Sequence, residues 1–169
     1  TAFLLKNLVD RNTQRYDPFQ LQIVCGSIER NVAKNKKLII ANDIGEIKDI
    51  LRDFYHKIWD AIQNEYNLYG DDFDKKKKDI IKDLVVERRR NLVLENKLIS
   101  RNNPQDEKII SSLIKKGLLK KIPSSNDTSF YQLSHDRLMA PVMEDLLAIA
   151  AREKSIKEIQ TRVKEVKVK

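Results

Sequence analysis

Apolar residues recur at helical spacing through the first 70 residues of the chain. Asp17 and Pro18 indicate a helix start, because aspartate caps helices and proline fits the first helical position. The apolar face predicted for this helix consists of Leu21, Val24, Cys25, Ile28 and Val32. A longer helix is predicted to begin at Asn42-Asp43 and to end at residues 69–72. Its stripe is wide enough for more than one neighbour and consists of Ile44, Ile47, Leu51, Phe54, Tyr55, Ile58, Trp59, Ile62 and Tyr66.

After residue 70 the pattern changes to shorter elements, and we place a domain boundary there. Asn103-Pro104 is predicted to cap and open a helix that Gly117 ends. The predicted elements are, in order, a helix over 74–87, a strand over 92–94, one or two helical turns over 95–101, a helix over 104–116, and strands over 118–122 and 130–133. This order of helices and strands is that of a winged helix, with the polar residues 123–129 as the turn of its wing.

A last helix is predicted from about Leu138, with Pro141 tolerated in its first turn. Further along, two heptads of an apolar seam are formed by Ile156, Ile159, Val163 and Val166. The predicted fold is therefore mainly α. It comprises a helical domain (1–70), a winged-helix domain with a small β-hairpin wing (71–136), and a basic C-terminal linker helix (137–169).

Composition narrows the class of protein. The chain has 169 residues, of which 41% are hydrophobic and 34% charged, and this excludes a disordered tail. It has no uncharged apolar run long enough for a bilayer span, and its first residues lack the pattern of a signal peptide. A single cysteine fits a reducing compartment, so we expect a cytoplasmic protein. The absence of an initiator Met suggests a piece excised from a longer chain.

Charge adds little to this picture. The formal net charge is +8, and residues 152–169, with seven basic and three acidic side chains, supply half of it. A basic excess in a linker helix does not identify a partner. The run Lys75–Lys78 follows three aspartates and is interpreted as a solvated helix start.

Several kinds of catalytic site are absent from the sequence. It contains no GxxxxGK[ST] phosphate-binding loop, no cysteine pair and no HExxH zinc motif, so we expect neither a nucleotide cradle nor a metal site. Ser134, His135 and Asp136 are adjacent, and three consecutive residues cannot face one another as a catalytic triad. By itself the chain is therefore not expected to be an enzyme.

Three segments carry a resemblance to a known family. They are YDPFQLQIVCGSIE at 16–29, GEIKDILRDFY at 45–55 and FYQLSHDRLMAPV at 130–142. Together they resemble the C-terminal half of the nucleotide-binding module of STAND-class NTPases, closest to the prokaryotic branch in which a P-loop core precedes a large variable region. The resemblance spans roughly residues 12–145, but the P-loop core of the family is missing from this chain.

The resemblance implies roles for a few residues. Pro18 would lie near the adenine or ribose of a nucleotide bound by the intact protein. His135 is similar to the histidine of the "MHD" motif, which in related immune ATPases contacts the β-phosphate of ADP and holds the closed state. Asp136 would cap the following helix or pair with Arg137. The alternative for His135-Asp136 is a purely structural join between strand and helix, and for Pro18 a simple helix opening.

These roles lead to the main functional hypothesis. The chain would be a regulatory part of a STAND NTPase, which senses nucleotide state and couples it to autoinhibition and oligomerisation in signalling or defence. It would hold no cofactor itself, whereas its parent protein would bind ADP or ATP with Mg. Its partners would be the P-loop core, a C-terminal sensor or effector region, and further copies of the parent, with no membrane.

The second hypothesis is a DNA-binding winged helix. A reading helix presents basic and amide side chains to base edges, and the helix over 104–116 offers Lys108, Lys115 and Lys116. However, Asp106 and Glu107 lie at its entering end, and the turn of the wing has no Arg or Lys. Acidic groups there oppose the approach of phosphates, so we do not expect nucleic acid as the partner.

Overall fold

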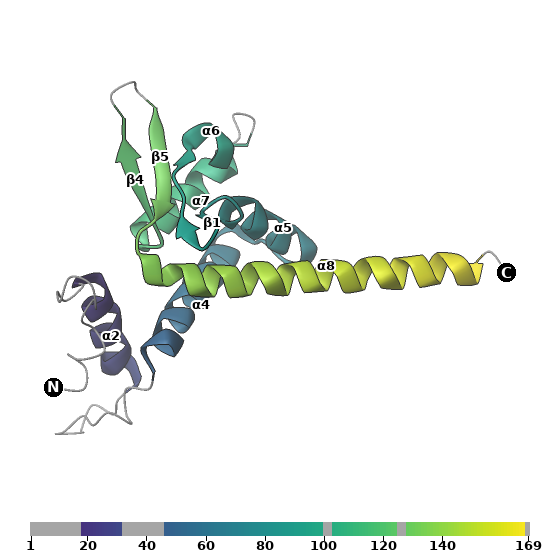
Figure 1. Cartoon of the computed structure of the whole chain (residues 1–169), viewed down its shortest axis with the longest axis horizontal. Coiled ribbons are helices and arrows are strands. Elements are labelled where there is room, and N and C mark those ends of the chain that lie inside the picture. Colours follow the sequence, from purple (N-terminus) through teal and green to yellow (C-terminus); the bar gives the residue numbers. More distant parts are fainter. Residues whose placement is uncertain (1–17, 32–45, 100–102, 125–127, 168–169) are drawn as a thin grey trace. The chain divides into compact units, whose positions relative to one another are not determined.

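The computed structural model describes residues 18–31, 46–99, 103–124 and 128–167, with side chains as far as Thr161 (Figure 1). Contacts divide the chain into two compact units, residues 1–57 and 58–169. The division falls inside helix α4 (Ile47–Tyr66), whereas the boundary predicted from the sequence lies between α4 and α5 (Gly70–Ile81). The helix caps predicted at Asp17 and at Asn42-Asp43 lie outside the described residues.

The first unit is built from α2 (Pro18–Asn31) and the first half of α4. Their apolar cluster consists of Ile23, Val24, Ile50 and Leu51, with Phe19, Ile28, Ile47 and Phe54 packed around it. The predicted burial of Cys25 is wrong, because that side chain is exposed. The buried face of α2 is instead shifted by one residue toward the N-terminus of the chain. It consists of Ile23 and Val24 together with the polar side chains of Gln20 and Ser27. A pattern of apolar residues alone does not reveal such a face.

The long helix α4 ends earlier than the sequence indicates. Asn67 has φ 51° and follows the last helical residue, Tyr66. The Leu68 N–H then donates to the Gln63 carbonyl oxygen at 3.1 Å. An asparagine in the left-handed region followed by this bond is a common helix ending. Gly70, predicted to end α4, is the first residue of α5.

Helix α5 is shorter than predicted, and a small hairpin takes the place of its last turns. The helix stops at Ile81, and β1 (Val85–Val86) pairs antiparallel with β2 (Arg89–Arg90). The Asn91 N–H donates to the Leu84 carbonyl oxygen at 2.8 Å and closes the base of the hairpin. Two adjacent β-branched valines favour this extended backbone, so the helix predicted over 74–87 is wrong beyond residue 81.

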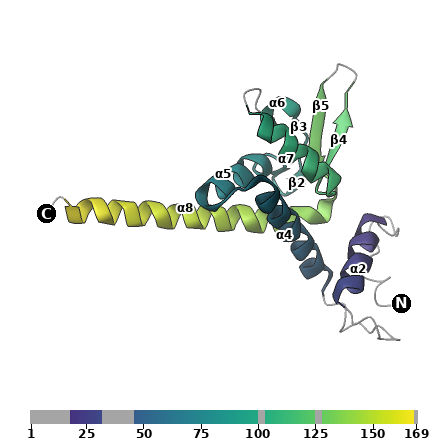
Figure 2. The same ribbon diagram turned by 180° about the vertical axis from the view of Figure 1, so that it is seen from behind.

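A three-stranded antiparallel sheet lies beside two helices (Figures 1 and 2). The elements are β3 (Val93–Leu94), α6 (Glu95–Leu98), α7 (Pro104–Lys115), β4 (Leu119–Pro123) and β5 (Ser129–Leu133). The strand order is β3-β5-β4, so the first strand pairs with the last. This topology, entered from α5, is a winged helix with β4 and β5 as the wing. Buried side chains of α7 and the sheet form its core, among them Ile109, Ile110, Leu113, Leu119, Tyr131 and Leu133.

The predicted ends of α7 are confirmed. The side chain of Asn103 accepts a hydrogen bond from the Gln105 N–H at 3.1 Å, and Pro104 is the first helical residue. Gly117 follows the helix with φ 80°, a conformation that glycine adopts without steric cost.

The chain continues through a short 3-10 helix, η1 (Asp136–Leu138), into α8 (Met139–Lys167). The first half of α8 packs on α5, and its C-terminal end projects beyond the rest of the second unit (Figures 1 and 2). Two residues of the predicted apolar seam, Ile156 and Ile159, are exposed in this projecting part. The side chains of the other two, Val163 and Val166, lie outside the described residues.

The run Lys75–Lys78 is not a solvated helix start, as the sequence suggested. Consecutive helical residues are about 100° apart, so four lysines point in four directions. Lys75 is exposed, and Lys76 pairs with the buried Asp106 of α7. Lys78 Nζ donates to both carboxylate oxygens of Glu153 on α8, at 2.8 and 2.6 Å. Lys77 is buried, and its Nζ lies 2.5 Å from Oδ2 of the equally buried Asp145.

Aromatic rings complete the surroundings of Lys77. Its ammonium lies 5.4 Å from the centre of the Trp59 ring and 5.7 Å from that of Phe73, within the range of cation–π attraction. A third ion pair, Arg152 with Asp74 at 2.7 Å, adds to the link between α8 and α5. The winged helix is thus attached to its C-terminal helix by charges, one pair of which is buried.

We expect Asp145→Asn to destabilise the second unit by about 3–5 kcal/mol, because it leaves the Lys77 ammonium buried without its counter-charge. The double variant Lys77→Met/Asp145→Leu should recover most of this loss, since apolar side chains of similar size need no counter-charge. Urea unfolding measures both. Lys154→Met, on an exposed pair of α8, is the control and should change stability by less than about 0.5 kcal/mol. Equal stability of Asp145→Asn and the native chain would contradict this account.

A polar contact joins α6 to the wing. Tyr131 Oη donates to Glu95 Oε1 at 2.7 Å, and Lys121 Nζ donates to the same oxygen at 3.3 Å. The hydrogen bond from Tyr131, aided by Lys121, holds the pKa of Glu95 below its ordinary value, although partial burial opposes this. The ionised form of Glu95 is therefore favoured in the folded state.

The lowered pKa of Glu95 in the folded state determines how its contribution to the stability of the chain changes with pH. Glu95 contributes its stability above the pKa that it has in the unfolded chain, near 4.3, and loses it as the pH falls through the lower folded value. We expect the stability difference between the native chain and Glu95→Gln to be largest at neutral pH and to shrink below about pH 4. Urea unfolding from pH 7 to pH 3 tests this, and a difference that grows on acidification would refute it.

Candidate functional site

The segment from Leu133 to Arg137, which we name the His135 turn, joins the wing to α8 through η1. Leu133, the first residue of the turn, and Leu138, which follows it, are both completely buried. These two apolar anchors fix where the chain leaves β5 and where η1 begins. Between them His135 is partly exposed, so the turn presents an imidazole at a defined corner of the winged helix.

His135 is the N-cap residue of η1. Its backbone is extended, with φ −145° and ψ 145°, and its Nδ1 accepts a hydrogen bond from the Arg137 N–H at 3.1 Å. An acceptor nitrogen carries no proton, so the neutral imidazole holds its proton on Nε2. The fold thus selects one tautomer of His135 and directs the donor nitrogen away from the backbone that it caps.

Ser134 ties the turn to the end of α7. Its N–H donates to the Leu118 carbonyl oxygen at 2.9 Å, and its Oγ donates to the Gly117 carbonyl oxygen at 2.6 Å. Because Gly117 and Leu118 connect α7 with β4, both ends of the wing are held at one point. The residue preceding His135 therefore has a structural role.

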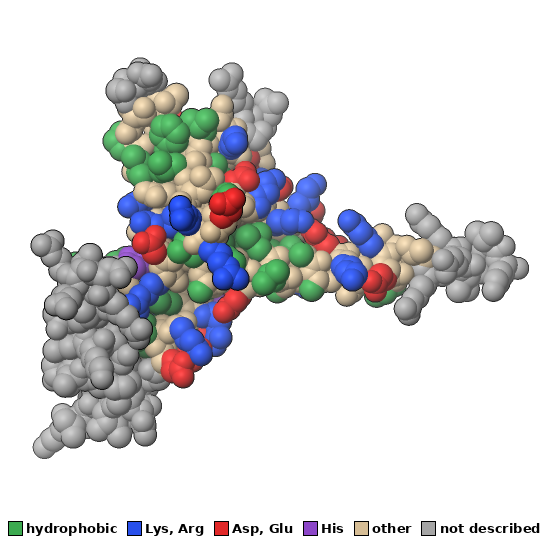
Figure 3. Space-filling model, in the orientation of Figure 1, with side chains coloured by type: hydrophobic (Ala, Val, Ile, Leu, Met, Phe, Trp, Pro, Cys, Tyr) green, Lys and Arg blue, Asp and Glu red, His purple; other side chains and the backbone are tan. Residues whose placement is uncertain are grey.

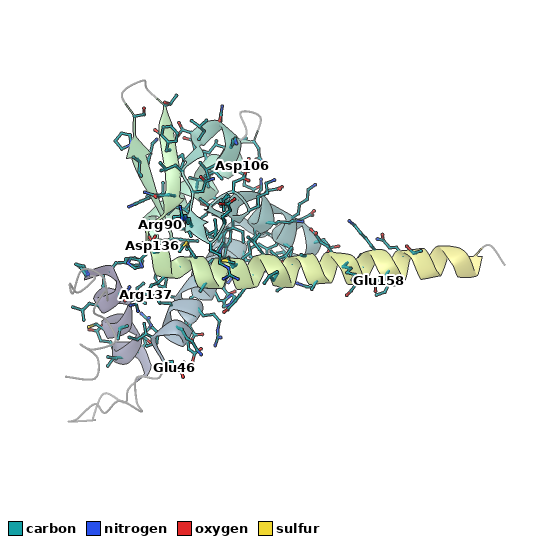
Figure 4. All side chains as sticks on the ribbon, in the orientation of Figure 1. Glu46, Arg90, Asp106, Asp136, Arg137 and Glu158 are labelled. Atoms are coloured by element: carbon teal, nitrogen blue, oxygen red, sulfur yellow. The ribbon has the colours of Figure 1, made fainter. Side chains whose placement is uncertain are left out.

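Arg90 of β2 holds the turn from the other side (Figure 4). Its Nη1 donates to the Leu133 carbonyl oxygen at 3.2 Å, and its Nε lies against Asp136 Oδ1 as an ion pair without hydrogen-bond geometry. Sequence reasoning missed Arg90, which is the last of three consecutive arginines. Only the bond of its side chain to the end of β5 distinguishes it, and the first strand of the hairpin that places Arg90 there was predicted as helix.

The cap that the sequence suggested for Asp136 is supplied by its neighbour His135. Asp136 itself lies in the first turn of η1, where a carboxylate is favoured by the helix dipole, and its ion pair is with Arg90. Arg137 contributes its backbone N–H to the cap. Asp136 and Arg137 both lie at the His135 turn, but their bonds differ from the predicted ones: Arg137 donates to His135, and Asp136 pairs with Arg90.

Pro18 is the first residue of α2 and is exposed. It belongs to the first unit, whereas His135 belongs to the second. Helix opening by a proline at this position agrees with its fixed φ. The nucleotide contact suggested for Pro18 stays a prediction.

Of the lysines in the DNA-binding alternative, Lys108 and Lys115 lie on α7 with exposed side chains, and Lys116 follows its last residue. The C-terminal end of α4 contacts this helix. Tyr66 Oη donates to the Lys108 carbonyl oxygen at 3.0 Å, and Glu65 Oε2 lies 3.6 Å from Lys116 Nζ and accepts from Ser112 at 3.1 Å. A groove of about 520 Å³ separates the two helices, and it is lined by Glu65, Tyr66, Pro104, Glu107, Lys108, Ser111, Ser112 and Lys115. Both acidic and basic groups line it, so it offers phosphates no uniformly positive surface.

Within the described ranges, no group of His, Cys, Asp and Glu side chains is arranged to hold a metal ion. Among the same residues, no helix combines the length and apolarity that a bilayer span requires. Comparison of the chain with family models, with curated proteins and with solved structures finds no match. The resemblance carried by the three sequence motifs therefore remains a hypothesis.

We expect Arg90→Ala to destabilise the second unit by about 1–3 kcal/mol, because the buried Leu133 carbonyl loses a charged donor. Asp136→Asn should cost less than about 1 kcal/mol, since Asp136 is exposed and solvent-exposed ion pairs contribute little. Urea unfolding of the two variants gives the comparison. Equal losses would show that the ion pair, and not the bond to Leu133, holds the turn.

Proposed function

We propose that the chain is the regulatory part of a STAND-class NTPase, in which the winged helix senses nucleotide state through His135. The observation that supports this most directly is the N-cap geometry of the His135 turn. It places the proton on Nε2, the form in which an imidazole donates to an oxygen acceptor. The sequence resemblance assigns this residue to the β-phosphate, and the tautomer fits that assignment.

The donor nitrogen of His135 fits one contact of a nucleotide site. A bound ADP would supply β-phosphate oxygens that accept hydrogen bonds. His135 of the second unit would donate its Nε2–H to one of them. For Pro18 of the first unit, which is exposed, the sequence resemblance suggests a separate contact with the adenine or ribose. The remaining phosphate contacts and the Mg site belong to a P-loop core, and the chain contains no P-loop sequence.

The connection of the His135 turn to α8 supports a regulatory role. Only the three residues of η1 separate His135 from α8, and α8 is fixed to α5 by the buried Lys77–Asp145 pair and two further ion pairs. A change at His135 would therefore move α5, the wing and α8 together. In the closed state this body would dock on the P-loop core, and after nucleotide exchange it would swing away and permit oligomerisation.

The DNA-binding alternative receives less support. In a DNA-binding winged helix the outer face of the second long helix enters the major groove. Here Tyr66 and Glu65 cover part of α7, and Lys116 is engaged in an ion pair. We therefore do not propose DNA as the partner.

The test of the sensor role uses two substitutions in the intact parent protein. His135→Asn keeps a strong N-cap, because an asparagine oxygen also accepts from the Arg137 N–H, but it lacks a donor at the position of Nε2. Removal of a hydrogen bond to a charged group costs about 1.5–3 kcal/mol. We expect the dissociation constant of ADP to rise roughly ten- to a hundredfold. The ratio of open to closed molecules should rise by the same factor. ADP-release rates and oligomerisation without a trigger are the measurements.

His135→Ala separates sensing from structure. It removes both the cap and the donor, so it should also lower the stability of the isolated chain, by about 1 kcal/mol. His135→Asn should melt within a degree or two of the native chain. A purely structural role predicts the opposite result: ADP release unchanged in His135→Asn, with a lower melting temperature in His135→Ala alone.

A further inference from the structure

The turn between β1 and β2 has an unfavourable sequence for its backbone. Its two central residues, Glu87 and Arg88, have φ values of 49° and 60°, and Val86 faces Arg89 across the hairpin. Two-residue turns with two positive φ angles favour Asn-Gly, because a side chain in the left-handed region costs about 1–2 kcal/mol. Departures from local preference of this kind concentrate at functional positions.

The hairpin holds its turn in a fixed position. Asn91 closes its base with the backbone bond to Leu84 and with a side-chain bond from Nδ2 to the Asp83 carbonyl oxygen, both 2.8 Å long. Arg90 attaches the second strand to the His135 turn. Beyond these anchors, the side chains of Glu87, Arg88 and Arg89 are exposed. Two guanidinium groups are thus presented on a rigid support.

Exposed apolar side chains accompany the arginines. β1 packs beside α8, and these elements carry Val86, which is 49% exposed, and Leu147, which is 70% exposed. In Figure 3 hydrophobic side chains lie over this part of α8 and over β1, with basic and acidic side chains at their border. An exposed apolar area with a charged rim is typical of an interaction site.

The chemistry of this surface indicates the kind of partner. Guanidinium groups bind carboxylates in a two-pronged geometry, and arginine beside apolar side chains is typical of protein interfaces. A nucleic-acid surface would be more uniformly basic, whereas Glu87 lies in the turn itself. A second copy is disfavoured by the net charge of +8. We infer that Val86–Arg89 and Leu147, the hairpin surface, dock a protein segment that carries carboxylates beside apolar residues.

The inference does not depend on nucleotide sensing and is tested on the chain itself. The probe is a dye-labelled synthetic peptide with a repeated Glu-Glu-Leu sequence, and its binding is measured by fluorescence anisotropy. We expect saturable binding that weakens with salt, and at least a tenfold loss in the variant Arg88→Glu/Arg89→Glu. Leu147→Asp should also weaken binding severalfold. The matched control, Lys154→Glu/Lys157→Glu, makes the same charge change near Glu158 on the projecting part of α8 (Figure 4) and should change affinity less than twofold.

A further variant separates binding from folding. Glu87→Asn/Arg88→Gly provides the preferred turn sequence, so it should melt at a higher temperature than the native chain and yet bind the peptide more weakly. The inference is overturned by absence of peptide binding, or by equal binding in the charge-reversed chain. Preference for a duplex DNA oligonucleotide over the peptide would overturn it as well. Self-association of the chain that is abolished by Arg88→Glu/Arg89→Glu would also overturn the inference, because the hairpin surface would then bind a second copy.

Discussion

The second unit depends on a buried charge, the Lys77 ammonium, that must find its partner in one place. The carboxylate that pairs with it belongs to Asp145 on a different helix. Trp59 and Phe73 provide the surrounding aromatic rings. A buried ion pair adds little net stability, because the cost of removing two charges from water offsets their attraction. It does penalise every arrangement of α5 and α8 that separates the two charges. The position of α8 on the winged helix is therefore specified more strictly than apolar packing alone would specify it.

The features that the sequence revealed are those determined by neighbouring residues. Asn103, Pro104 and Gly117 define the two ends of α7 because caps and left-handed endings involve only a few adjacent residues. The wing was predictable for a related reason, since two β-rich runs with turn-forming residues between them pair antiparallel. The order of these elements then leaves few topologies, and the strand order β3-β5-β4 is the one that a winged helix requires.

The features that the sequence concealed depend on distant residues. The acidic partners of Lys76, Lys77 and Lys78 lie on α7 and α8, more than twenty residues away in the sequence. The buried face of α2 includes Gln20 and Ser27, whose polar side chains do not mark it as buried in the sequence. In the candidate site the position of His135 in a turn was predictable. Its tautomer and its attachment through Arg90 were not, because both require coordinates.

The length of α8 has a mechanical consequence. Its 29 residues, at 1.5 Å each, extend for about 43 Å. Ion pairs fix its first half to α5 as far as Glu153, and the part after Glu153 projects from the body, so the helix moves with the body as a lever arm. If the body that carries α8 rotated by about 10° about the His135 turn, the far end of the helix, about 43 Å away, would move by roughly 8 Å, which is more than one helical turn. A small rotation of the body about the His135 turn therefore becomes a large displacement at the far end of α8.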